Sequence, residues 1–197
     1  GLFGAERLTA PRTPAEPRGE AARFLAERLL REVGRWFDIE SRPFPPPARR
    51  DRAAVGRLRA ALVRAGRERN AIGLYLGGGS AHLLRLRTDA DLGFAMPDES
   101  PAQRRLDVVL LHRLVLEAGL GIGAEAVARE MNVVYEREMP AAIAAVDDGR
   151  AQVCCLLNPA RVGQVMEIAL AGEVLPQKST DFYPKLPSGL AVYRIED

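Results

Sequence analysis

The stretch that decides the fold runs from residue 132 to residue 171 and reads NVVYEREMPAAIAAVDDGRAQVCCLLNPARVGQVMEIALA. Short apolar runs that are typical of strands alternate here with segments whose apolar residues recur at helical spacing. An order of strand, helix, strand, helix and strand predicts an α/β fold, in which helices pack on a mixed sheet with part of its pairing parallel. The expected elements are strands at 132–136, 151–157 and 190–195 and helices at 139–147 and 159–171.

Upstream of this stretch the apolar residues change to a period of two, on both sides of residues 77–80, which read GGGS. Ile72, Leu74 and Leu76 precede the glycines, and residues 82–87 alternate again after them. A glycine triplet also occurs in phosphate-binding loops, but those loops lead into a helix and end in Gly-Lys-Ser or Gly-Lys-Thr. We therefore predict a β-hairpin here.

Three further helices are predicted from apolar residues spaced three or four apart, at 20–37, 53–69 and 106–116. The proline cluster at 43–47 separates the first two and predicts an extended connector. Residues 1–19 mix prolines with charges and lack an apolar period, which predicts a flexible lead. The expected organisation is this lead followed by a single α/β domain at 20–197, with an arginine-rich helical front (20–70) and a sheet-forming body (71–197).

Charge is unevenly spread along the 197 residues, although the formal net charge is only +2. Residues 1–70 hold 16 basic and 9 acidic side chains, whereas residues 71–197 hold 12 and 17. Residues 49–69 carry eight arginines, but no aromatic residues are interleaved with them for base stacking. The pattern favours a solvated helix face over a nucleic-acid interface, which stays open as an alternative function.

Apolar stretches in the chain are all shorter than the 18 or so residues of a membrane span, and its start lacks the pattern of a secretory signal. We expect a cytoplasmic protein with no membrane partner. Cys154 and Cys155 are adjacent in a predicted strand and so point to opposite faces, which indicates two buried apolar side chains. His82 and His112 lack partners at ligand spacing, so no metal site is predicted.

Lysine occurs only twice in the chain, at Lys178 and Lys185, while the other 26 basic residues are arginines. A lysine ammonium is compact and rotatable, and its pKa shifts more readily than that of arginine. The segment around the two lysines also contains several hydroxyl groups and three prolines, a balance that suits a phosphate or carboxylate ligand. The alternative is a rigid rim whose polar groups satisfy the backbone. The candidate ligand-binding residues are Lys178, Ser179, Thr180, Tyr183 and Lys185.

Asn158 is a sixth candidate for binding the ligand, because it stands where a predicted strand runs into a predicted helix. Ligands of open α/β sheets bind beyond the carboxyl ends of the strands, next to helix amino termini. An asparagine in this place is also a common helix cap. The sequence leaves these two roles open.

Three segments carry a family resemblance: residues 106–112 (LDVVLLH), 151–159 (AQVCCLLNP) and 172–190 (GEVLPQKSTDFYPKLPSGL). They resemble the carboxyl-terminal half of the bacterial and archaeal proteins called domain of unknown function 1015. The hairpin residues 73–76 and the pair Trp36 and Phe37 are also similar, so the resemblance spans roughly residues 20–197.

In that family a further amino-terminal half carries an Asp-Gly-His-His-Arg stretch similar to the active segment of ParB-like and free-serine-kinase proteins. This chain has no such stretch. The resemblance implies that Lys178, Ser179, Thr180, Tyr183, Pro184 and Lys185 match the family's signature, whereas Gln177 departs from the proline expected there.

From the lysines and the resemblance together we expect a domain that binds a phosphorylated or carboxylated small molecule. Together with a half that this chain lacks, the domain would complete a phosphotransferase-like site such as that of an amino-acid kinase. A partner chain or a homo-oligomer would then be needed, nucleotide and Mg²⁺ would act only in the larger enzyme, and the domain alone would be inactive. The alternative is a structural or interaction module without a ligand.

Overall fold

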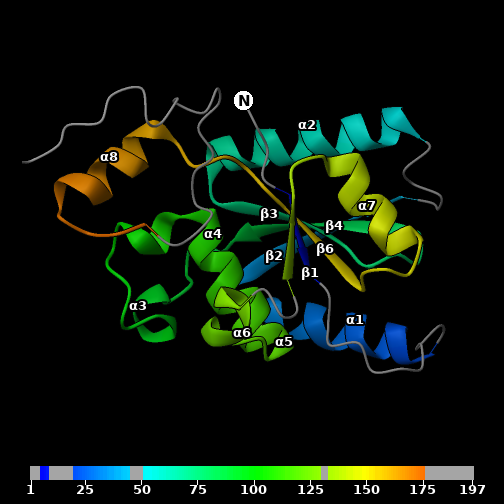
Figure 1. The fold of residues 1–197 in the computed structure, drawn as a ribbon, viewed down its shortest axis with the longest axis horizontal. Helices are drawn as coiled ribbons and strands as arrows, with labels where there is room; N and C mark the ends of the chain where they lie inside the picture. Colours follow the sequence, from blue (N-terminus) through cyan, green and yellow to red (C-terminus); the bar gives the residue numbers. More distant parts are fainter. Residues whose placement is uncertain (1–4, 9–19, 45–50, 130–132, 176–197) are drawn as a thin grey trace, which may run out of the picture.

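The protein is a mixed α/β fold built on one six-stranded sheet, in the order β2-β4-β3-β6-β1-β5 (Figure 1). The computed structural model describes residues 5–8, 20–44, 51–129 and 133–175. Every pairing between the described strands is antiparallel. The strands are β1 (Ala5–Leu8), β2 (Phe37–Pro43), β3 (Ala71–Tyr75), β4 (Ser80–Leu86), β5 (Val133–Glu136) and β6 (Val153–Leu157).

Helices cover both faces of the sheet (Figure 1). In this view α2 (Arg52–Glu68) and α7 (Met139–Asp147) lie above it, and α1 (Glu20–Val33) lies below. None of the described helices is long and apolar enough to cross a membrane. The remaining helices are α3 (Leu92–Ala95), η2 (Gln103–Arg105), α4 (Asp107–Leu110), η3 (Leu111–Glu117), α5 (Ala118–Leu120), α6 (Ala124–Ala128) and α8 (Val162–Leu170).

Each face of the sheet has its own hydrophobic core, because consecutive residues of a strand point to opposite faces. All five residues of β3 and of β6 are buried. Cys155 packs in the core with α1, α4 and η3, whereas Cys154 packs in the core with α2 and α7. The prediction that both cysteines are buried, on opposite faces, is confirmed.

The predicted hairpin is confirmed as β3 and β4, with Tyr75 opposite Ala81 at the turn. Gly77, Gly78 and Gly79 all have positive φ, at 74°, 69° and 88°. Side chains rarely adopt such backbone angles, so three glycines in a row allow the chain to reverse within this short turn. The glycine triplet therefore serves the turn, and the chain continues as a strand.

The alternation of elements predicted from residue 132 onward is confirmed for β5, α7, β6 and α8. The prediction of partly parallel pairing is wrong for the described strands, because β1 lies between β5 and β6 and pairs antiparallel with both. The β5–α7–β6 unit is thus a βαβ unit whose two strands are separated by a third. Residues 5–8 form this third strand, so the prediction of a flexible lead is wrong for these four residues. The predicted strand at 190–195 lies outside the described residues.

The first helix is shorter than predicted and is followed by a strand that the sequence did not suggest. α1 ends at Val33, and Phe37 begins β2, which pairs with β4 over seven residues. A bond from Arg87 N to Trp36 O (2.9 Å) ties the turn between the two elements to the end of β4. β2 is an edge strand that ends at Pro43, and edge positions tolerate proline because one side of the strand needs no ladder bond.

Candidate functional site

The helix that begins at Asp107 changes to π-helical turns in η3, the segment Leu111–Glu117, before α5 completes it. A π-helical segment widens the backbone and is frequent at functional sites. Leu111, Leu114 and Val115 point into the core from this segment. His112, Arg113 and Glu117 from the same segment line a pocket of about 360 Å³.

This pocket, which we call the η3 pocket, lies between η3, α6 and β5. Its apolar wall includes Val109, Ile122 and Val127. Pockets that bind small molecules usually have volumes of about 300–1,000 Å³ and are lined mainly by apolar side chains, with a few convergent polar groups. The polar residues that line it are Glu99, Gln103, His112, Arg113, Glu117 and Tyr135.

One guanidinium stands between two carboxylates in the η3 pocket. Arg113 donates from Nε to Glu99 Oε1 (2.5 Å) and from Nη1 to Glu117 Oε2 (2.8 Å). These two bonds, of which that to Glu117 has the larger effect, raise the pKa of Arg113. The Glu99 side chain is only 13% exposed, and its second oxygen, Oε2, accepts no hydrogen bond from the residues that the structure describes.

The chain that follows α8 passes along the rim of the η3 pocket. Ser100 Oγ donates to Glu173 Oε2 (2.6 Å), and Gln103 Nε2 donates to the carbonyl of Val174 (3.2 Å). Ser100 and Gln103 also bond each other, through Ser100 N and Gln103 Oε1 at 3.1 Å. Since Gln103 lines the pocket, the segment that leads toward Lys178 starts at its edge.

Five of the six predicted ligand residues, Lys178, Ser179, Thr180, Tyr183 and Lys185, lie outside the described residues. Asn158, the sixth, lies at the end of β6 and does not line the η3 pocket. Its Nδ2 donates to the carbonyls of Leu62 (3.3 Å) and Ala71 (3.4 Å). The helix-cap role is wrong for Asn158, because the N-cap of α8 is Arg161.

Asn158 belongs to a polar cluster around Asp107, at the first turn of α4. Asn70 Nδ2 donates to Asp107 Oδ1 (2.6 Å), and the amide of Asn158 also hydrogen-bonds this carboxyl. Burial raises the pKa of Asp107 to about 6, against the opposing effect of these bonds and of the nearby Arg161. The cluster joins the end of α2, the start of α4 and the end of β6 around a buried acid whose pKa is raised.

Sequence reasoning missed Asp107, although it stands in the 106–112 run. Gly66, which lies inside α2, belongs to the same cluster. A Cβ atom at this position would meet Asn158 Nδ2 at 2.3 Å. The glycine therefore makes room for the amide, and a glycine within a helical pattern was the available signal.

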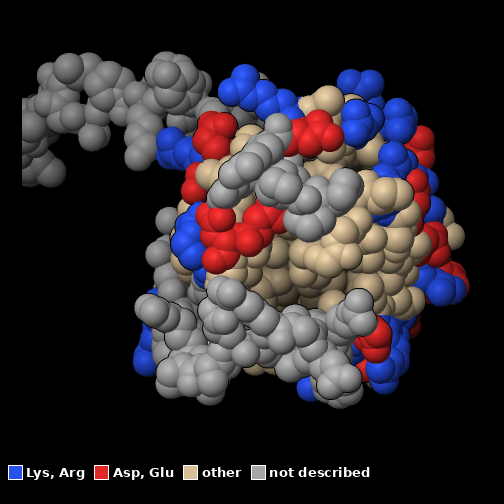
Figure 2. All heavy atoms as spheres, turned by 90° about the vertical axis from the view of Figure 1, so that its right-hand side faces the viewer, with Lys and Arg blue, Asp and Glu red and all other residues tan. Residues whose placement is uncertain are grey.

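The arginine-rich face of α2 is exposed, as predicted, and Asp51 caps the helix through Ala54 N (2.8 Å). A shallow groove of about 430 Å³ runs along it between Arg59, Arg64 and Arg67. Figure 2 shows basic side chains along the upper edge of the molecule, on the side where α2 lies in Figure 1. The described part of the chain contains no group of three His, Cys, Asp or Glu residues that could hold a metal ion.

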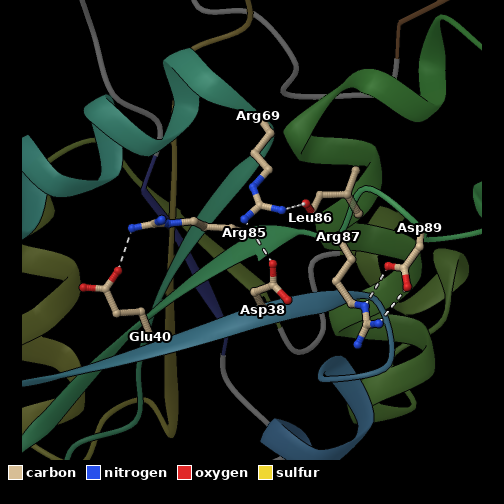
Figure 3. Close-up of polar contacts among 7 residues, drawn as sticks. All are labelled: Asp38, Glu40, Arg69, Arg85, Leu86, Arg87 and Asp89. Atoms are coloured by element: carbon tan, nitrogen blue, oxygen red, sulfur yellow. Dashed lines mark hydrogen bonds and ion pairs between the residues drawn. The ribbon is translucent and has the colours of Figure 1, made fainter.

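A second group of charges joins α2 to the edge of the sheet (Figure 3). Arg69 donates to the carbonyl of Leu86 (3.1 Å) and pairs with Asp38 (3.0 Å). Arg85 pairs with Glu40 across β4 and β2 at 2.6 Å. These contacts link neighbouring elements and line neither the η3 pocket nor the groove along α2, so we assign them a structural role.

His82 is also structural. Its Nδ1 lies 2.9 Å from Ser41 Oγ, across the β2–β4 pair, and burial lowers its pKa. A lowered pKa keeps the ring neutral near neutral pH, which suits a half-buried strand position.

Comparisons of the chain with protein-family models, with curated proteins and with solved structures found no match. The resemblance of residues 106–112, 151–159 and 172–190 to the domain of unknown function 1015 family therefore stays a prediction. The structure does bring parts of these segments together. Asp107 of the first contacts Asn158 of the second, and Val174 of the third lies against Gln103, just before the first.

Proposed function

We propose that this chain is a cytoplasmic α/β domain that binds a phosphorylated or carboxylated small molecule, with residues 178–185 supplying positive charge at the rim of the η3 pocket. The observation that carries the proposal is the pair of hydrogen bonds from Ser100 and Gln103 to Glu173 and Val174. Lys178 follows Val174 by four residues, and four residues of extended chain span at most about 14 Å. Chain length therefore allows Lys178 to supply its charge at the rim of the pocket.

Charge balance makes the two lysines necessary to this proposal. The described charged groups that line the η3 pocket are Glu99, Glu117 and Arg113, which together leave one negative charge. An anionic ligand needs further positive charge, and Lys178 and Lys185 would supply two ammonium groups.

Phosphoryl transfer also needs a nucleotide, with Mg²⁺ held by carboxylates. We therefore propose that the domain completes a phosphotransferase-like site together with a half carried on other sequence, as the resemblance implies. Alone it would bind the anion without turning it over.

Thermal unfolding with inorganic phosphate, phosphoserine and nucleotides tests this proposal. A ligand at a hundred times its Kd stabilises the fold by about 2.7 kcal/mol, a rise in Tm of about 5–10 °C for a chain of this size. We expect such a rise with at least one phosphorylated compound, and its loss in Lys178→Ala and Lys185→Ala. Arg64→Ala, on the exposed face of α2, is the matched control. No rise with any compound, or an equal rise in the lysine variants, would contradict the proposal.

A second candidate function, an interaction module that docks a second copy of this chain, is favoured by the outer face of α8. Val162, Met166, Leu170 and Val174 follow one another at intervals of four and are 74%, 56%, 84% and 83% exposed. Side chains four residues apart share one face of a helix, so at least the first three form an apolar stripe, and such stripes mark interaction sites. In Figure 1, α8 lies at the left edge of the molecule.

The oligomeric state tests this second function. We expect the chain to form dimers whose dissociation constant rises strongly in Leu170→Glu, measured by light scattering over a wide range of concentrations. Glu125→Gln, on the outer side of α6, is the control. A monomer at every concentration would eliminate the self-docking function.

A further inference from the structure

The outer face of α2 carries positive charge that the proposed function does not use. Its arginines, Arg52, Arg57, Arg59, Arg64 and Arg67, are all exposed, and no acidic residue occurs between the first and the last of them. In Figure 1, α2 lies above the sheet, and its buried residues occupy the side of the helix opposite these arginines. The guanidinium groups therefore point away from the protein.

The arginines of α2 also differ from others on the described surface in their partners. Exposed arginines elsewhere commonly pair with a carboxylate, as in the pairs Arg35–Glu32, Arg105–Glu167, Arg129–Glu125 and Arg150–Asp148. On α2, Arg57 lies 3.8 Å from Asp51, whereas Arg52, Arg64 and Arg67 form no ion pair with the residues that the structure describes. A partner can reach these three groups without displacing a carboxylate of the described chain.

The shallow groove of about 430 Å³ along this face gives the charge a shape. The residues that line the groove are Gly56, Arg59, Ala60, Val63, Arg64 and Arg67. Its floor is made of the small residues, and with 3.6 residues per turn Arg59 projects from one side of that floor and Arg64 from the other. A chain of phosphates that lies along the groove would meet guanidinium groups from both sides.

Three features of this face are unfavourable for the protein on its own. Arg52 stands in the first turn of α2, where the helix dipole disfavours positive charge. Arg64 and Arg67 are like charges three residues apart, which repel each other on a helix. Gly56 lowers helix stability relative to alanine, although a Cβ there would have no atom within 4 Å. A bound polyanion would offset both charge placements, and Gly56 leaves room for its backbone.

The composition of the face indicates which polyanion fits. Membrane-surface helices and protein interfaces depend on large apolar or aromatic anchors, and between Arg52 and Arg67 the exposed uncharged residues are glycine and alanine. Single-stranded nucleic acid is bound through aromatic stacking, which this face does not offer. The phosphate backbone of a duplex needs only positioned positive charge, and the guanidinium fork matches phosphate oxygens.

We propose that the outer face of α2 binds the phosphate backbone of duplex nucleic acid without regard to base sequence. The aromatic residues that the sequence lacks in this region are needed for single strands and not for a duplex backbone. The inference goes beyond the proposed function, because it uses only described residues and would stand if residues 178–185 bound nothing.

Fluorescence anisotropy of a labelled DNA duplex of about 20 base pairs, titrated with the full chain at several salt concentrations, tests the inference. Each phosphate contact contributes about −0.9 to the slope of the logarithm of the binding constant against the logarithm of the salt concentration. With about four to five contacts we expect a slope of about −4. The affinity should then fall by about 100- to 500-fold between about 50 and 200 mM salt. A duplex of another base sequence should bind equally well.

Two double variants with the same loss of charge separate the α2 face from general electrostatic attraction. Arg64→Gln with Arg67→Gln should make the slope shallower by about 2 and weaken binding at least tenfold at the lowest salt. Arg129→Gln with Arg150→Gln, at exposed positions outside α2, should bind as the wild type does. Gly56→Arg adds a guanidinium to the groove floor, so it should steepen the slope by about 1 and tighten binding, a gain that misfolding cannot imitate.

Four results would each overturn the inference. They are no duplex binding at the lowest salt, equal slopes in the two double variants, tighter binding of a single strand of the same length, and displacement of the duplex by polyglutamate as effectively as by unlabelled duplex at equal charge. The last result would assign the face to acidic protein partners.

The outcomes are distinguishable from those of the proposed function. A single nucleotide or inorganic phosphate offers too few phosphates for several contacts on α2, so Arg64→Ala stays a valid control for stabilisation by these small ligands. Lys178→Ala and Lys185→Ala should retain duplex binding. Loss of duplex binding in both lysine variants, with no effect of the α2 double variant, would contradict this inference whatever the small ligands do.

Discussion

Replacing Gly66 by alanine is expected to destabilise the protein, although the same change in a helix ordinarily stabilises it. Alanine is favoured over glycine in a helix interior by about 1 kcal/mol. At Gly66, however, the new methyl would meet Asn158 Nδ2 at 2.3 Å and Cγ at 2.8 Å. The amide must therefore move away from Leu62, Ala71 and Asp107.

The magnitude follows from the hydrogen bonds that the displaced Asn158 amide would lose. Two of its bonds are long, at 3.3 and 3.4 Å, and the third goes to the Asp107 carboxyl. Because the amide has two N–H groups for these three acceptors, the bonds together contribute about 2–3 kcal/mol, and the helix preference for alanine offsets about 1. We expect Gly66→Ala to lower the free energy of unfolding by about 1–2 kcal/mol, or the Tm by about 2–8 °C.

Denaturant unfolding of four variants provides the assay. Gly56→Ala lies on the same helix with no atom within 4 Å of the new Cβ, and it should stabilise by up to about 1 kcal/mol. In an Asn158→Ala background, where the amide is gone, Gly66→Ala should also stabilise. If Gly66→Ala stabilises the wild type as much as Gly56→Ala does, or destabilises equally in both backgrounds, the packing of Asn158 on Gly66 is refuted.

Three other predictions concern the acid cluster, the core and the sheet. Burial raises the pKa of Asp107 to about 6 in the folded state, above its ordinary 3.8, so the fold favours the protonated carboxyl. The stabilisation from this protonated form is complete below pH 3.8 and is lost as the pH rises through 6. The loss in unfolding free energy is up to about 3 kcal/mol. Asp107→Asn should therefore flatten the fall in unfolding free energy between pH 4 and pH 8, and an unchanged pH profile would contradict the assignment. Tyr75→Phe removes the 2.6 Å hydrogen bond from the buried Tyr75 hydroxyl to Asp147. We expect denaturant unfolding to show a loss of about 1–2 kcal/mol in unfolding free energy, and an unchanged value would count against that bond. Arg7→Pro should cost at least about 3 kcal/mol by removing a ladder bond from a strand with neighbours on both sides, whereas a wild-type Tm would show that β1 is dispensable.

Much of the fold could be predicted because periodicity reports local structure. The hairpin and the order β5, α7, β6 and α8 follow from apolar spacing within a few residues. β1 and β2 were missed for a shared reason. β1 has four residues, too few for a period, and β2 continues an apolar pattern that also fits the end of a helix. Both strands depend on partners far away in the sequence.

The candidate site divides in the same way. The sequence singled out Asn158 by its place between a strand and a helix, and the structure places it there. Its partners were not predictable, since Leu62 lies 96 residues away and Ala71 lies 87 away. The η3 pocket was missed altogether, because Glu99, Arg113 and Tyr135 come from a loop, a helix and a strand that are separate in the sequence.

By itself, then, the sequence determined which segments become helices and strands over most of the described chain. The physical reason is that both depend on neighbours in the chain: a helix on its internal backbone hydrogen bonds, and a strand on its alternation of buried and exposed sides. Only the tertiary structure decided that β1 separates β5 from β6, that Gly66 admits Asn158 and that Glu99 and Glu117 share Arg113. Such contacts depend on how the layers pack in space, and no local pattern of residues encodes them.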